Sequence, residues 1–223
     1  MSGRACRAVL FDLDGTLADT APDLIAAVNR LRAEAGRAAL PEAALRPLVS
    51  KGGRALLARA FDDLEEAARE ALLPRFLTHY AAALAVHTRP FAGIEPLLAA
   101  IEARGLRWGI VTNKPEALAR AVVQGLGWAG RSAALVGGDT LPVRKPAPDP
   151  LWLAARQLGL APGDCLYVGD DARDIEAAVA AGMPGIAALW GYREAHEDPR
   201  AWPAAAWIAA PAELLPHLGN ASA

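Results

Sequence analysis

From about residue 90 onward, short apolar runs alternate with segments of helical periodicity, and this alternation constrains the fold more than any other feature. Strands that alternate with helices over short connections predict a parallel sheet with helices on both faces. We therefore predict an α/β fold with a doubly wound parallel sheet. Strand-like runs occupy residues 108–111, 134–136, 165–168, 186–189 and 207–208, and helix-like segments occupy residues 95–103, 150–158 and 172–181 and follow Pro115.

A first apolar run, at residues 8–11, is separated from this series by a long stretch of helical character. The stretch begins with Thr20-Ala21-Pro22-Asp23, which resembles a capping box. A second helix is expected near Pro41, a third at residues 55–60, and at residues 64–84 either one long helix or two helices broken at Pro74. We predict an α/β core of residues 1–17 and 88–223, an inserted all-helical domain of residues 18–87, and linkers at residues 17–19 and 86–90.

The composition is that of a soluble globular protein, because 53% of the residues are hydrophobic and 22% are charged. A net charge of -2 argues against a nucleic-acid partner held by bulk positive charge. The sequence offers no apolar stretch long enough to cross a membrane, and its start lacks signal-peptide character. Its two cysteines and four histidines lack the spacing of a disulfide framework or a zinc site. We therefore expect a cytoplasmic protein without a membrane or nucleic-acid partner, and the sequence leaves its oligomeric state open.

Polar side chains stand at or beside the carboxyl ends of predicted strands, and ligands bind at this edge of a doubly wound sheet. Each group alone has a plain explanation: acids in a solvated turn, a threonine that caps a helix, a loop lysine, and helix N-caps. The convergence of all four groups on one edge favours a functional site instead. The groups are Asp12 with Asp14, Thr112 with Asn113, Lys145, and Asp170 with Asp171.

These residue types suit the chemistry of a phosphate ester. The carboxylates of Asp12, Asp14 and Asp170 are hard oxygen ligands of the kind that Mg²⁺ prefers, and a cation relieves the repulsion between close acids. Thr112 and nearby backbone N–H groups can hold phosphate oxygens, while Lys145 supplies positive charge to the phosphoryl group. One aspartate can attack phosphorus to form an aspartyl-phosphate, and a second acid can protonate the leaving alcohol and later deprotonate water.

The same residues, in the same order, resemble the four motifs of the haloacid dehalogenase-like (HAD) hydrolases. The resemblance spans essentially the whole chain, implies a HAD-like Rossmannoid core, and makes residues 18–87 a helical cap. Two further segments are similar to the subfamily that contains phosphoglycolate phosphatases, namely residues 111–115 and residues 137–139 ahead of Lys145-Pro146. The four motifs are Asp12-Leu13-Asp14-Gly15-Thr16, Thr112, Lys145 and Gly169-Asp170-Asp171-Ala172-Arg173-Asp174.

This resemblance implies a role for each residue of the core motifs. Asp12 would be the nucleophile, and Asp14 would be the general acid and base that also offers its backbone carbonyl to Mg²⁺. Asp170 would complete the metal ligands beside Asp12 and Asp14. Thr112 and Lys145 would bind the transferring phosphoryl group.

The neighbouring motif residues would support these groups. Asp174 would hold the motif lysine or the metal's waters, whereas Asp171 occupies a position that is often serine in phosphoglycolate phosphatases, which leaves its role open. Gly15, Thr16 and Asn113 would contribute to substrate binding. The partner implied by these motifs is a small phosphorylated metabolite.

Lys51 and Arg54 flank two glycines in the helical stretch and are candidates to bind a carboxylate or hydroxyl of the substrate. The same loop would equally serve as an interhelical turn with two solvated cations. It resembles the cap of N-acetylmuramic acid 6-phosphate phosphatases, whose Gly-Asp-Asp-x-Arg-Asp box is also similar to residues 169–174. We therefore predict a Mg²⁺-dependent phosphatase of a small phosphorylated acid, with 2-phosphoglycolate as the first choice and N-acetylmuramic acid 6-phosphate as the alternative.

Two other functions fit the motifs less well. A phosphosugar mutase would use Asp12 in the same way but return the phosphoryl group to its substrate. A non-catalytic binding protein on this scaffold would have no need for all four polar groups.

Overall fold

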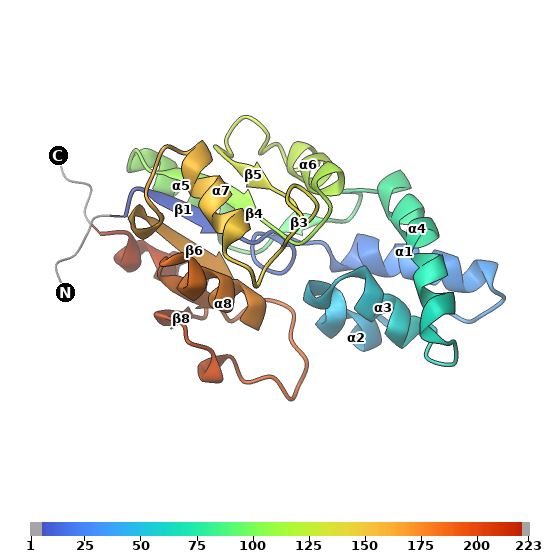
Figure 1. Ribbon diagram of the computed structural model, residues 1–223. Coiled ribbons are helices and arrows are strands. Elements are labelled where there is room, and N and C mark those ends of the chain that lie inside the picture. The colour runs from blue at the N-terminus through green and yellow to red at the C-terminus, as the bar shows by residue number, and fades with distance from the viewer. Residues whose placement is uncertain (1–5, 220–223) are drawn as a thin grey trace.

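The computed structural model describes residues 6–219 and has a six-stranded parallel sheet at its centre (Figure 1). The strand order is β5-β4-β1-β6-β7-β8. The first strand of the chain, β1, therefore lies in the middle of the sheet, between β4 and β6. The predicted doubly wound parallel sheet is confirmed. Its strands are β1 (Ala8–Phe11), β4 (Arg107–Val111), β5 (Leu135–Val136), β6 (Cys165–Gly169), β7 (Gly185–Ala188) and β8 (Ala206–Ile208).

Helices cover both faces of the sheet because successive strand residues point to opposite sides. Val9 and Phe11 of β1 pack with α5 and α6, whereas Leu10 packs with α7 and α8. Both faces are therefore buried, which agrees with the continuous apolar runs of the strands. The helices of the core are α5 (Ile94–Ala103), α6 (Glu116–Gly125), α7 (Asp149–Gln157) and α8 (Ala172–Ala181), with 3-10 turns η2 (Pro162–Asp164), η3 (Pro199–Ala201) and η4 (Pro211–Leu218).

Between β1 and α5 the chain leaves the sheet and forms a group of helices beside it (Figure 1). We call residues 21–82 the helical insert. Its helices bury a core of their own that includes Val28, Leu56 and Phe76, and Tyr192 of the α/β core packs against it. The elements of the insert are α1 (Ala21–Glu34), α2 (Glu42–Leu45), the 3-10 helix η1 (Arg46–Lys51), α3 (Gly53–Ala60) and α4 (Glu66–Ala82).

Two elements of the insert differ from simple expectation. The second expected helix is only one turn of α-helix, α2, because Pro47 in the first turn of η1 has no N–H with which to continue the α-helical pattern. In contrast, α4 continues through Pro74 as one long helix, where the sequence had left two possibilities. The hydroxyl of Thr78 donates to the carbonyl of Pro74 at 3.0 Å in that helix.

The two linkers pair with each other as a short antiparallel ribbon of β2 (Ala18–Asp19) and β3 (Arg89–Pro90). The expected capping box at Thr20 is wrong, because its hydroxyl donates to Asp14 at 2.5 Å and caps no helix. Asp23 instead accepts hydrogen bonds from the backbone N–H groups of residues 87 and 88. These contacts fix the start of the insert to the end of the returning chain. None of the helices within residues 6–219 combines the length and apolar character needed to cross a bilayer.

Candidate active site

The carboxyl ends of β1, β4 and β6 bring the polar motifs to one edge of the sheet. Asp12 follows β1, and its backbone N–H continues the parallel pairing by donating to the carbonyl of Val168 at 2.9 Å. Thr112 follows β4 and donates its N–H to the carbonyl of Val136, also at 2.9 Å. Asp170 directly follows β6. The strand pairing therefore places these three side chains at the edge that the sequence predicts.

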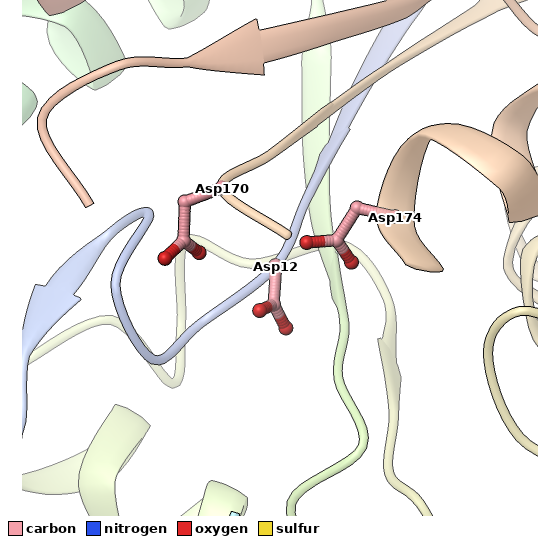
Figure 2. Close-up of side chains that lie close together, drawn as sticks. All are labelled: Asp12, Asp170 and Asp174. Atoms are coloured by element: carbon pink, nitrogen blue, oxygen red, sulfur yellow. The ribbon is translucent and has the colours of Figure 1, made fainter. Parts of the chain in front are cut away.

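Three of the acids form a buried cluster. Oxygen atoms of Asp12, Asp170 and Asp174 all lie within 4.8 Å of one another. Figure 2 shows that Asp12 and Asp170 come from loops at strand ends, whereas Asp174 comes from the first turn of a helix, α8. Oδ1 of Asp12 is buried without a hydrogen bond of good geometry, although the ammonium of Lys145 lies 2.9 Å away.

Burial disfavours the charged forms of these acids. It raises the pKa of Asp12 to about 6, even though the ammonium of Lys145 opposes the shift, and the charges of Asp174 and Asp14 add to it. Burial likewise raises the pKa of Asp170 well above its usual range, with a further contribution from Asp12. A bound cation would relieve this accumulation of negative charge.

Asp170 is held by a set of hydrogen-bond donors from three parts of the chain. Its carboxylate accepts from the hydroxyl of Thr16 at 2.9 Å, the hydroxyl of Ser50 at 2.7 Å and the backbone N–H of Tyr192 at 3.0 Å. Thr16 is fully buried and its hydroxyl positions Asp170, while the role in substrate binding that the resemblance implies for Thr16 stays a prediction. Gly15 has a φ of 92°, and an added Cβ would lie 2.2 Å from Oδ2 of Asp170. Gly15 is therefore required for the close approach of the two segments.

Asp14 has different surroundings from Asp12. Its carboxylate lies 3.0 Å from the ammonium of Lys114 and accepts a hydrogen bond from Thr20. The ammonium of Lys114 also lies 4.4 Å from the ring centre of Tyr80, which belongs to α4 of the insert. Burial disfavours the charge on Lys114, but Asp14 and Tyr80 outweigh it and raise its pKa. Asp14 is thus placed by contacts from both the core and the insert.

Lys145 contacts two acids of the cluster. Its ammonium lies 2.9 Å from Asp12 and 2.6 Å from Asp174, and it donates to the hydroxyl of Tyr167 at 2.7 Å and the carbonyl of Val111 at 2.9 Å. Burial disfavours this charge, yet the two aspartates more than offset it and raise the pKa of Lys145. The group therefore remains an ammonium at neutral pH.

Asn113 links two of the motifs. Its side-chain Nδ2 donates to the carbonyl of Lys145 at 2.9 Å, while its Oδ1 is buried without a partner. Thr112 accepts a hydrogen bond from the N–H of Lys114 at 3.2 Å and does not cap α6, whose N-cap is Pro115. The alternative explanation of Thr112 as a helix cap is therefore wrong.

Asp171 and Asp174 form a reciprocal capping box at the start of α8. The side chain of Asp171 accepts from the N–H of Arg173 at 3.0 Å, and Asp174 accepts from the N–H of Asp171 at 3.1 Å. Asp174 uses its other oxygen for Lys145. Asp171 points instead toward Lys51 of the insert, at 2.7 Å. Asp171 thus contacts a residue of the insert, whereas Asp174 contacts Lys145 of the core.

A cavity of about 200 Å³ lies over these residues, between the sheet edge and the helical insert. Lys51 and Arg54 line it as expected, but their charged groups pair with Asp171 and Glu197 and with Glu70, respectively. The core side of the lining is polar, and much of the insert side is apolar. The core side consists of Asp12, Asp14, Thr112, Asn113, Lys114, Pro115, Leu118, Arg144 and Arg173, and the insert side of Leu24, Val49, Ser50, Lys51, Gly52, Gly53, Arg54, Leu73, Phe76, Leu77 and Tyr80.

Several residues of this region were not among the residues expected from the sequence to form the site, among them Lys114, Ser50, Tyr80 and Arg173. Lys114 stands in the predicted strand-end motif, so the polar run that identifies Thr112 could also have identified it. Arg173 likewise stands in the last predicted motif, whereas Ser50 and Tyr80 reach the site only through tertiary contacts, and no local pattern distinguishes them.

The match to known proteins agrees with this geometry. Residues 6–182 match the family model of the haloacid dehalogenase-like hydrolases. The chain therefore belongs to this family of hydrolases. Members generally use a divalent metal ion, and the buried acidic cluster fits such a site.

Individual proteins that are similar to this chain allow a more detailed comparison. A phosphoglycolate phosphatase of Xanthomonas campestris pv. campestris is 55% identical over 208 residues, which cover 93% of this chain and 94% of the relative. An N-acetylmuramic acid 6-phosphate phosphatase of Pseudomonas aeruginosa is 45% identical over 216 residues, or 96% of each chain. The crystal structure of a predicted phosphoglycolate phosphatase from Haemophilus somnus superimposes with a TM-score of 0.85 at 26% identity, covering 96% of this chain and 98% of the other. All three are similar to this chain over nearly its full length.

Proposed function

We propose that this chain is a Mg²⁺-dependent phosphomonoester hydrolase that acts through an aspartyl-phosphate on Asp12. The observation that supports this most strongly is the separation of the two acids of the first motif. Asp12 lies beside Lys145 and the other two acids of the cluster, whereas Asp14, two residues further on, lies beside Lys114. An attacking carboxylate and a separate proton-transfer group are what a two-step phosphoryl transfer requires.

In the first step, a carboxylate oxygen of Asp12 attacks phosphorus and the bond to the leaving alcohol breaks. Lys145 and Thr112 stabilise the negative charge of the transferring phosphoryl group, and the backbone N–H groups beside them add further donors. Asp14, in its protonated form, gives its proton to the leaving oxygen. Its contacts with Lys114 and Thr20 hold the carboxyl group in place.

In the second step, water attacks the phosphorus of the aspartyl-phosphate, and Asp14 now accepts a proton from that water. Phosphate leaves and Asp12 is restored as a free carboxylate, so the atoms and protons balance over one turnover. The same acid thus acts first as a donor and then as an acceptor.

Mg²⁺ is the metal that we propose, because the available donors are all oxygen atoms. Asp12 and Asp170 would bind it through their side chains and Asp14 through its backbone carbonyl, while Asp174 remains on Lys145. When bound, the ion would neutralise charge on the acids and on the phosphoryl oxygens. The close approach of three buried acids and the raised pKa values of Asp12 and Asp170 are in keeping with a cation at this position.

We further propose that residues 18–87 form a cap over a catalytic core of residues 1–17 and 88–223. The paired linkers β2 and β3 are two chain crossings side by side, which suits a hinge. The insert supplies much of the cavity lining, so its closure would exclude water while the aspartyl-phosphate forms.

The substrate we propose first is 2-phosphoglycolate, because the 55% identical relative is a phosphoglycolate phosphatase. N-acetylmuramic acid 6-phosphate is the second candidate, and one observation favours it. The cavity wall from α4 is apolar at Leu73, Phe76 and Leu77, and a larger substrate with methyl groups would use that wall whereas glycolate would not. Either substrate is a small phosphorylated metabolite of the cytoplasm, where unpaired cysteines such as Cys6 and Cys165 stay reduced.

A phosphate-release screen tests the proposed function. The enzyme would be given 2-phosphoglycolate, N-acetylmuramic acid 6-phosphate and glucose 6-phosphate, each with Mg²⁺ and with a chelator. We expect Mg²⁺-dependent release from one of the two acids at a higher kcat/KM than from the hexose phosphate. A higher value for the muramic acid ester would favour the second candidate. Release from none of the three would contradict the proposal.

A further inference from the structure

The helical insert and the core meet at a group of four charged side chains. The ammonium of Lys51 lies 2.7 Å from Asp171 and 2.5 Å from Glu197, and the guanidinium of Arg173 lies 2.8 Å from Asp171. We call Lys51, Asp171, Arg173 and Glu197 the docking cluster. Only Lys51 belongs to the insert, so its two ion pairs both cross from the insert to the core.

The docking cluster is charge-balanced, with Asp171 buried and its other members half-buried. Two cations face two anions, and the side chain of Asp171 is only 5% exposed. Burial alone would raise the pKa of Asp171, but Arg173 and Lys51 outweigh it and lower the pKa to about 2. Glu197 is fixed in turn by the backbone N–H of Glu194 at 3.0 Å. The cluster therefore presents a fixed pair of carboxylates to the insert.

A second contact leads from this cluster to the acidic site. Arg173 donates to the backbone carbonyl of Ser50 at 2.6 Å, and the hydroxyl of Ser50 donates to Asp170 at 2.7 Å. The same hydroxyl lies 3.3 Å from the backbone carbonyl of Asp14. Ser50 adjoins Lys51 in η1, so docking of the lysine and placement of the serine occur together.

We propose that Asp171 is a positioning residue that docks the helical insert onto the core through Lys51 and Arg173, and so brings Ser50 to Asp170. This inference rests on the proposed function, because it assigns a catalytic purpose to the docking. It gives Asp171 a role apart from the acids of the metal cluster. It also gives Lys51 a task other than binding a substrate carboxylate, since both anions at its ammonium are already supplied by the core.

The substitution Asp171→Asn is a sharp test of this role. Asparagine caps helices as well as aspartate does, so α8 keeps its N-cap, while the charge that attracts Lys51 is lost. Lys51→Met removes the same ion pair from the other side and keeps much of the apolar stem. Arg37→Met serves as the matched control, because Arg37 pairs with Asp63 on the exposed surface within the insert.

Hydrogen–deuterium exchange of residues 46–60 measures docking without any need for activity. We expect faster exchange there in Asp171→Asn and in Lys51→Met, and in the double variant an increase smaller than the sum of the two, because both substitutions remove the ion pair between Lys51 and Asp171. In the docking variants, exchange of the sheet should match the wild type. In Arg37→Met, exchange of residues 46–60 should also match the wild type. Wild-type exchange of residues 46–60 in Asp171→Asn would overturn the inference, and this result is independent of whether the proposed substrate is correct.

Kinetics then separates docking from substrate binding. Each docking variant should lower kcat/KM about tenfold, mainly through KM, and by the same factor for 2-phosphoglycolate and for p-nitrophenyl phosphate, which has no carboxylate. Asp171→Glu, which keeps the charge, should recover most of the loss. A loss confined to 2-phosphoglycolate in Lys51→Met, with normal activity in Asp171→Asn, would instead make Lys51 a substrate-binding residue and overturn the inference.

Discussion

Asp12 and Asp14 are separated by a single residue, yet the chain gives their carboxylates opposite environments. Asp12 is buried against Lys145 and two further acids, whereas Asp14 is held by Lys114 and Thr20. Strand β1 ends at Phe11 and the chain turns at Leu13, so the two carboxylates meet different partners, which is the basis for the separate roles proposed for them. The proposed division between attack and proton transfer therefore depends on the surroundings of these two single residues.

The first prediction concerns the charge on Asp12. Its pKa in the folded, metal-free protein is about 6, above the value of about 3.9 in an unfolded chain. Between these pH values the folded state binds a proton that the unfolded state has lost, so stability rises as pH falls through this window. At pH 8 the buried charge destabilises the fold, and Asp12→Asn should raise the free energy of unfolding in chelator by on the order of 2 kcal/mol.

Urea unfolding of both proteins in chelator at pH 8 and at pH 4 checks this expectation. The difference between them should shrink toward zero at pH 4, where Asp12 is already protonated in the folded state. Adding Mg²⁺ at pH 8 should stabilise the wild type more than the variant. A difference that stays the same at both pH values would show that charge on Asp12 is not its cause.

The second prediction concerns Lys114, whose ammonium lies between Asp14 and the ring of Tyr80. Lys114→Met removes the charge that orients Asp14, so kcat/KM for alkyl phosphates should fall by about 10²-fold, the lower end of the effect of general acid–base catalysis. The loss should be smaller for p-nitrophenyl phosphate, because nitrophenolate leaves without a proton. Steady-state kinetics on both substrates measures the contrast. An equal loss on both would assign Lys114 a purely structural role.

At the scale of elements, the turn between β1 and β2 determines whether the acidic cluster can form. Gly15 adopts a φ of 92°, and an added Cβ would lie 2.2 Å from Oδ2 of Asp170. Gly15→Ala should therefore displace Asp170, weaken Mg²⁺ binding and lower kcat by 10²-fold or more, on the order of the loss of one preorganised group. Calorimetric titration with Mg²⁺ and steady-state kinetics measure the two effects.

Gly36 provides the matched control for this substitution. It also has a positive φ, 68°, but no atom lies within 4 Å of the position of an added Cβ. Gly36→Ala should cost about 1 kcal/mol of stability through backbone strain and leave catalysis unchanged. If both alanine variants lose activity to the same degree, the close contact with Asp170 is not the reason.

The elements that the sequence predicts well are those defined by local patterns. Apolar runs followed by polar residues identify β1, β4 and β6 together with Asp12, Thr112 and Asp170, because strand pairing keeps these ends at one edge. Side-chain direction was harder to predict, since Thr16 turns to Asp170 and Thr20 turns to Asp14. Both hydroxyls donate to carboxylates that their local motifs do not identify, and the partner of Thr16 lies 154 residues away in the sequence.

Contacts between the insert and the core lie beyond local patterns. Ser50 and Asp170 are 120 residues apart, and so are Lys51 and Asp171. The basic loop marked Lys51 as a candidate for function, but only the tertiary structure gives it two carboxylates of the core as partners. The sequence thus identifies Lys51 as a candidate, but it does not identify the groups that Lys51 contacts.

At the scale of the whole molecule, the cavity lies between the α/β core and the helical insert. The parallel sheet supplies acids, a lysine and backbone donors at a rigid edge, and the helical insert supplies a partly apolar wall and the residues that reach across. In the proposed function, the core would carry out the reaction and the insert would select the leaving group. Substitutions in α4 should accordingly change the KM values of different substrates more than their kcat values.

The central claim, that Asp12 is phosphorylated and Asp14 acts as the proton-transfer group, is tested most directly by Asp14→Asn with p-nitrophenyl phosphate. Nitrophenolate needs no general acid, so the first step should proceed, whereas hydrolysis of the aspartyl-phosphate should be slow without a base. We predict a burst of one equivalent of nitrophenol in rapid mixing, with phosphate recovered on the peptide that contains Asp12 after acid quench. Slow linear release without a burst, and no phosphorylated Asp12 peptide, would contradict the account.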